Sequence, residues 1–294
     1  MKTELFLGLV FYFCLFCNKK DMNTTLIQLI SVVLYGNQVI KGAQLPILFS
    51  TNNPAFRPFR TIDFYKVDLD DMDVRPRLIA ENPADWFDYL IQHNCQALRL
   101  MAYPIDEDFL SISFGEDDKH WMIETIFNDY SIFWMMQSNL EENNRGQKTG
   151  EIHYIMGPQA DTIDMGDDLL FAKKRLTAAL KNILKFACNH PNSFDGDRWA
   201  RIFNTSLEVL DNYHLRNLFE EKRYDASWLP MNAISDTALQ LIFASYKAFV
   251  FGGEGSWTDQ SFDSEEIQEE FIKTSAQLYQ ALQDAILSAV NREE

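Results

Sequence analysis

The chain turns at one glycine-rich stretch, Ala248-Phe249-Val250-Phe251-Gly252-Gly253-Glu254-Gly255-Ser256-Trp257-Thr258-Asp259. Three glycines in four positions are improbable inside a helix, because each costs about 1 kcal/mol there relative to alanine. Helical apolar patterns enter the stretch from Ser235 and leave it from Asp263. We therefore expect the glycines to end one helix and to turn the chain into the next, with Trp257 on the corner.

Helical patterns also fill the rest of the second half of the chain. Asp168 or its neighbour Asp167 can cap a helix that runs to about Asn189, and its lysines fall on the solvated side of the apolar stripe. The last helix is expected to begin with a capping box at 263–266. Its predicted buried stripe contains Ile267, Phe271, Leu278, Leu282, Ile286 and Val290.

The first half of the chain alternates short apolar runs with turn residues, which is typical of strands. Strands are expected at 62–67, 97–102, 109–114, 121–127, 131–137 and 151–156, and a helix is expected to begin after Asn82. Short connections between the strands predict an antiparallel sheet. The fold class is therefore α+β, with an antiparallel sheet in the N-terminal half packed with a helical C-terminal half. The expected division is a strand-rich part, 22–160, and a helical part, 161–294, with one continuous core as the alternative.

The first 21 residues form a signal-like or non-native extension in this interpretation. Leu5 to Phe16 is an apolar run of 12 residues, too short for a membrane span of about 20 residues, so no transmembrane helix is expected. Translation from Met22 would make the protein cytoplasmic. The alternatives are a lipoprotein anchored at Cys17 and a secreted protein.

The negative net charge of the chain bears on which class of partner it could bind. The net charge is −17, and residues 1–60 hold six basic and two acidic residues, so the rest of the chain carries −21. Such an acidic body repels phosphate backbones, which argues against nucleic acid as a partner. It would attract a basic protein partner.

No familiar catalytic motif is present. The glycine stretch lacks the features of a nucleotide-binding loop or a dinucleotide fingerprint, and the chain has no H-E-x-x-H or G-x-S-x-G sequence. No catalytic residue, metal site or cofactor is therefore predicted. His120 and His153 could meet on the sheet, with Glu124 or Glu151 nearby.

The glycine stretch itself has two interpretations. It is a helix–helix corner pinned by Trp257, or its backbone N–H groups and polar side chains bind a ligand or partner. The candidate binding residues are then Gly253, Glu254, Ser256, Trp257 and Asp259.

Residues 251–259 resemble a Phe-Gly-Gly-x-Gly-Ser-Trp-Asn-Asp signature near the C-terminus of uncharacterised bacterial proteins. Thr258 stands where that signature has asparagine. The resemblance covers about a dozen residues, and it implies no activity and no catalytic residues.

The sequence favours an acidic bacterial binding or interaction protein without catalytic activity, of the toxin-neutralising or accessory kind. The alternative is a hydrolase or transferase with a site near the corner between Gly252 and Asp259. A cluster of His120, His153, Glu254 and Asp259 would favour the enzyme, and a flat acidic aromatic surface would favour the binding protein.

Overall fold

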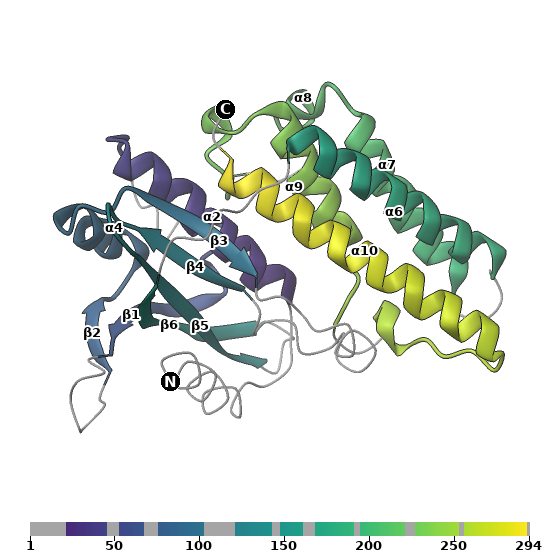
Figure 1. Ribbon diagram of the computed structural model, residues 1–294, viewed down its shortest axis with the longest axis horizontal. Helices are drawn as coiled ribbons and strands as arrows, with labels where there is room; N and C mark the ends of the chain where they lie inside the picture. The colour runs from purple at the N-terminus through teal and green to yellow at the C-terminus, as the bar shows by residue number, and fades with distance from the viewer. Residues whose placement is uncertain are drawn as a thin grey trace. The chain divides into compact units, whose positions relative to one another are not determined.

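The computed structural model describes residues 22–45, 53–67, 76–102, 121–142, 148–160, 168–190, 195–220, 227–252 and 256–292 (Figure 1). They fall into two compact units. The sheet unit takes the described residues from 22 to 160 together with Ser227–Pro230, and the helical unit takes the rest. The expected α+β class is confirmed. Within the described ranges, no helix combines the length and the apolar character that a bilayer crossing requires.

The sheet unit contains one six-stranded sheet. Its strands are ordered β2-β1-β6-β5-β4-β3. Their bounds are β1 Phe59–Lys66, β2 Arg77–Ala80, β3 Ala97–Ala102, β4 Trp121–Ile126, β5 Ser131–Glu142 and β6 Lys148–Ala160. The expected strands at 97–102, 121–127, 131–137 and 151–156 are present, whereas β2 was not predicted and 109–114 lies outside the described residues.

The prediction of a purely antiparallel sheet is wrong. Strand β1 runs parallel to β6, with Ile62 opposite Ile152 and Phe64 opposite Tyr154, while the other neighbouring strands are antiparallel. Turn residues report only on strands that follow each other along the chain. No turn joins β1 to β6, so nothing local in the sequence indicated this pairing.

Helices α2 (Met22–Ile40) and α4 (Pro83–Gln92) belong to the same unit as the sheet and pack on it. The Phe64 ring stacks on the Trp86 ring of α4 at 4.3 Å and on the Tyr154 ring at 4.8 Å. The buried Tyr154 hydroxyl donates to Gln28 Oε1 of α2 at 2.5 Å. An aromatic layer and one buried hydrogen bond therefore fix both helices against the sheet.

An amide side chain covers part of the β3 edge of the sheet. Strand β3 is an edge strand, and unpaired edge groups invite pairing with another chain. Asn37 of α2 accepts from the Leu98 N–H at 2.7 Å and donates to the Leu98 carbonyl at 2.9 Å. Its side chain thus replaces part of a missing neighbouring strand.

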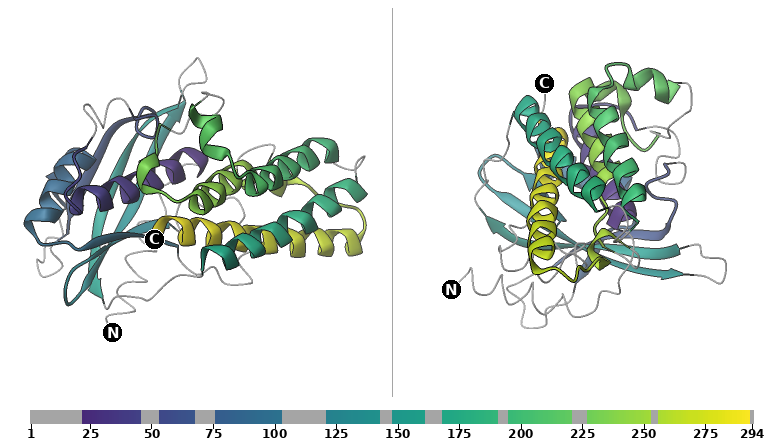
Figure 2. Two further views of the ribbon diagram at one scale, coloured as in Figure 1. Left: turned by 90° about the horizontal axis from the view of Figure 1, so that it is seen from above. Right: turned by 90° about the vertical axis from the view of Figure 1, so that its right-hand side faces the viewer.

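In the described part of the helical unit, four long α-helices pack as a bundle and one short α-helix accompanies them (Figure 2). Their bounds are α6 Leu169–Asn189, α7 Gly196–Asp211, the short α8 Leu215–Glu220, α9 Asp236–Ala248 and α10 Glu265–Asn291. The four long helices form a ring in which α6 neighbours α7, α7 neighbours α9, α9 neighbours α10 and α10 neighbours α6. Bundles of this kind bury one apolar stripe from each helix.

Side-chain caps mark the start of three of the described helices. Asn82 caps α4, Asp168 caps α6 and Ser235 caps α9, each through its side-chain oxygen. The start of a helix after Asn82 was predicted, and Asp168 was one of the two cap residues proposed for α6. The buried stripe predicted for α10 is confirmed from Phe271 to Val290, and Leu278, Leu282 and Ile286 have at most 1% of their surface exposed. Ile267, the first residue of the predicted stripe, is only half-buried. The capping box predicted at 263–266 is wrong, since Ser264 precedes α10 without a side-chain hydrogen bond.

Candidate functional site

Trp257, the most prominent residue of the glycine corner, lies in the core of the helical unit. None of its surface is exposed. Its ring centre lies within 5.2–5.5 Å of those of Trp199, Phe203 and Phe271, and its Nε1 donates to Ser275 Oγ at 2.7 Å. The indole therefore packs against both α7 and α10 and satisfies its one polar atom.

The polar residues of the corner hydrogen-bond within the corner. The Ser256 N–H donates to Asp259 Oδ2 at 3.1 Å, and the Ser256 side chain accepts from the Asp259 backbone, so the pair forms a capping box on the 3₁₀ turn Trp257–Asp259. Gly252 has a φ of +85°, as expected for a glycine that reverses the chain. Gly253 and Glu254 lie outside the described residues. A ligand site at this corner remains a prediction.

His153 lies on β6 between two carboxylates. Its Nδ1 is 3.5 Å from Asp63 Oδ2, and its Nε2 is 3.7 Å from Glu151 Oε2. Burial raises the pKa of Asp63, and the neighbouring His153 and the Tyr65 hydroxyl act in the opposite direction. Because the carboxylates face opposite ring nitrogens, one cation cannot be shared by all three side chains. Among the described residues, no three histidines, cysteines or acidic residues are placed to hold a metal ion.

Glu151 is the expected neighbour that contacts the His153 ring, whereas Glu124 lies two strands away in the sheet. Glu124 is buried on β4, with Arg99 Nη1 3.9 Å from its Oε2. His120 lies outside the described residues. Asp259 belongs to the helical unit, whereas His153 belongs to the sheet unit. The four-residue cluster that would favour an enzyme therefore remains a prediction.

The helical unit contains a groove of about 640 Å³, which we call the α6 groove. One wall is a single face of α6. It carries side chains spaced three or four residues apart, at Leu170, Lys173, Lys174, Thr177, Ala178 and Lys181. The other lining residues are Tyr213, after α7, and Asp236, Thr237 and Gln240 in the first turns of α9.

Lys173 is the most constrained lysine of the α6 groove. Its Nζ donates to Gln240 Oε1 at 2.7 Å and lies 5.6 Å from the centre of the Tyr213 ring. Gln240 is buried and donates its Nε2 to the Asn212 carbonyl at 2.7 Å, which fixes the position of its oxygen. Burial lowers the pKa of Lys173, and Asp211 acts in the opposite direction. The ammonium group is therefore held in place and partly shielded from water.

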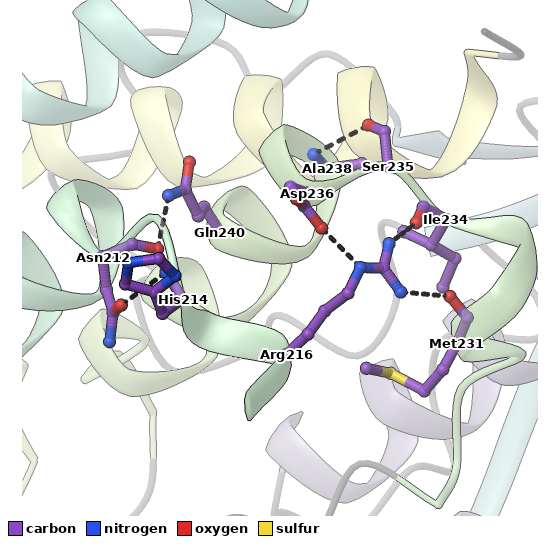
Figure 3. Close-up of polar contacts among 9 residues, drawn as sticks. All are labelled: Asn212, His214, Arg216, Met231, Ile234, Ser235, Asp236, Ala238 and Gln240. Carbon is purple, nitrogen blue, oxygen red and sulfur yellow. Dashed lines mark hydrogen bonds and ion pairs between the residues drawn. The ribbon is translucent and has the colours of Figure 1, made fainter. Parts of the chain in front are cut away.

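Arg216 of α8 shapes the wall opposite α6 (Figure 3). Its guanidinium donates to the carbonyls of Met231 and Ile234 and pairs with the Asp236 carboxylate. The first turn of α9 is thereby tied to the preceding loop. The Asp236 carboxylate is engaged by Arg216, so it offsets little of the positive charge of the lysines.

The α6 groove is both positive and apolar at its surface. Helix α6 contains five basic residues and no acidic one, in a chain of net charge −17. Leu170 is 61% exposed and Tyr213 is 81% exposed, although both side chains are large and apolar. Exposed apolar groups beside positive charge are typical of surfaces that contact a partner or ligand.

Sequence reasoning assigned the lysines of α6 to the solvated side of the helix and did not recognise a site. Helical periodicity cannot separate these two cases, because the wall of a polar groove and a free polar surface produce the same sequence pattern. The available signal was compositional: a helix with five basic residues is unusual in so acidic a chain. Nothing in the sequence indicated that Tyr213 and Gln240 belong to this site, since only the folded bundle brings them to α6.

Comparison with known proteins identified no relative of this chain. No protein-family model matches the chain, and neither the curated proteins nor the solved structures contain a match.

Proposed function

We propose that the protein is a non-enzymatic binding protein and that the α6 groove takes a negatively charged ligand. One observation carries the proposal: Lys173, Lys174 and Lys181 line the same wall of a groove in an otherwise acidic chain. An anion bound against this wall would be attracted by all three ammonium groups.

The surroundings of Lys173 support binding. The Gln240 oxygen and the Tyr213 ring hold its ammonium group before any ligand arrives, which reduces the entropy lost on association. Partial burial also strengthens attraction between charges, because the effective dielectric constant is lower than in water. Screening limits the repulsion from the acidic remainder of the chain to about 8 Å at physiological salt.

The sequence-based expectation of a basic protein partner stands as a separate proposal. The overall charge supports it, and the α6 groove has the opposite local charge. The alternative of a hydrolase or transferase at the glycine corner has less support, because Ser256 and Asp259 already have a structural role in their mutual capping box.

Isothermal titration calorimetry with three anionic probes tests the proposal. The probes are citrate, pyrophosphate and poly-L-glutamate, each at physiological salt. A variant with methionine at 173, 174 and 181 keeps most of the apolar stem of each side chain and removes three charges. Lys185→Met is the matched control, because Lys185 belongs to α6 but does not line the groove.

We expect at least one probe to bind the unmodified protein and to bind the triple variant about tenfold more weakly, since each exposed ion pair contributes up to about 1 kcal/mol. The control should bind like the unmodified protein. The proposal is wrong if no probe binds, or if the triple variant binds all three as tightly as the unmodified protein does.

A further inference from the structure

We infer that the ligand of the α6 groove is an acidic, extended segment of a partner protein, an inference that rests on the proposed function. Three properties of the groove indicate this class of ligand: its length, the spacing of its charges and its apolar end.

The groove is elongated along α6. Its lining residues on that helix extend from Leu170 to Lys181, eleven positions apart. At 1.5 Å per residue this distance is about 16 Å along the helix axis. A wall of that length, with side chains on one continuous face, suits a chain-like ligand.

The lysines are separated into two positions. Lys173 and Lys174 lie side by side, and Lys181 follows two helical turns later, about 10–12 Å further along the axis. Two separated positions of positive charge favour a ligand with two anionic groups over a single small anion. An extended peptide advances about 3.3 Å per residue, so two acidic residues three or four positions apart match this spacing.

The end of the groove near Lys173 offers an apolar contact. Leu170 lies one turn before Lys173, and the Tyr213 ring lies beneath the ammonium group of Lys173 at 5.6 Å. Both side chains are mostly exposed. A leucine or aromatic residue of the partner segment would bury this surface, as anchor residues do at protein interfaces. A small inorganic anion would leave it exposed.

Two labelled peptides of identical composition test the inference by fluorescence anisotropy. Each has one leucine, two glutamates and neutral residues. The spaced peptide has its glutamates four positions apart, and the adjacent peptide has them side by side. Citrate and pyrophosphate serve as competitors.

We expect the spaced peptide to bind about fivefold more tightly than the adjacent peptide, because only the spaced one engages both lysine positions. Lys181→Met should weaken the spaced peptide by a similar factor and leave the adjacent peptide unchanged. Tyr213→Ser should weaken the binding of the spaced peptide more than the binding of the same peptide with serine in place of its leucine. Lys185→Met should change the affinity for neither peptide.

Other results would overturn the inference. Equal binding of the two peptides, with displacement by citrate or pyrophosphate, would identify a small anion as the ligand and leave anion binding intact. A change in oligomeric state on substitution of the groove lysines, measured by analytical ultracentrifugation, would identify a second copy of the chain. Absence of binding by every probe would overturn the proposed function as well.

Discussion

The glycine corner and the α6 groove contrast in how visible they are in the sequence. The corner combines glycines, a tryptophan and polar residues, yet its Trp257 is wholly buried and its Ser256 and Asp259 bond to each other. The groove is built from ordinary lysines on a helix, yet it gathers charge, exposed apolar surface and a buried amide. The conspicuous residues form a tight turn, and the inconspicuous ones line the α6 groove.

The difference has a physical basis. A tight turn restricts the backbone conformation of its own residues, so the residue types that it needs occur at consecutive positions in the sequence. A groove is a relation between elements, and each element supplies residues that would be equally acceptable on a free surface. The comparison predicts that substitutions at the corner affect mainly stability and that substitutions in the groove affect mainly binding.

The largest effect is expected for Trp257→Ala. Removing a wholly buried tryptophan should lower the free energy of unfolding by about 3–5 kcal/mol, measured by urea denaturation. Trp257→Phe is the matched control, since it keeps an aromatic ring and loses the hydrogen bond to Ser275. A loss below about 1 kcal/mol for the alanine variant would contradict the packing role.

Arg216→Met should have the next largest effect. The change removes the donors for the Met231 and Ile234 carbonyls, and we expect a loss of about 1–2 kcal/mol in denaturation experiments. Asp236→Asn breaks only the exposed ion pair and should cost less than about 1 kcal/mol. Equal losses for the two variants would show that the ion pair, and not the carbonyl contacts, stabilises this wall.

Ser256→Ala tests the capping box at the corner. Loss of the cap should cost about 1 kcal/mol, and combining it with Asp259→Asn should add little, because the two side chains act as one unit. Anion binding in the α6 groove should be unchanged in both variants. Unchanged melting together with lost partner binding would instead support the predicted ligand site at the corner.

Lys173→Met should lower the free energy of unfolding by about 1 kcal/mol, because it removes the donor to the buried Gln240 oxygen, and it should weaken anion binding. Burial lowers the pKa of Lys173 below the ordinary value of 10.5, so this lysine loses its proton at a pH below 10.5. Anion affinity of the unmodified protein should therefore fall between neutral pH and 10.5. Calorimetric titrations of Lys173→Met should show a flatter pH profile, and an unchanged profile would contradict the role of Lys173.

The sequence by itself determined the elements whose signals are local. The start of α4 after Asn82 and the cap of α6 at Asp168 or Asp167 were predicted from single residues, because a capping side chain bonds a backbone group two or three positions away. Strand β3 occupies the predicted range, and the buried stripe of α10 follows its 3.6-residue period. Hydrophobic periodicity reports which face of an element is buried, and that information suffices for the α+β class.

Only the tertiary structure decided the relations between distant segments. The parallel pairing of β1 with β6 joins strands with no common turn, so neither composition nor periodicity could indicate it. The α6 groove likewise depends on Tyr213 and Gln240, which come from different parts of the chain and meet α6 only in the bundle. Long-range contacts depend on the combined packing of many side chains, and this explains why the elements could be read from the sequence while the candidate site could not.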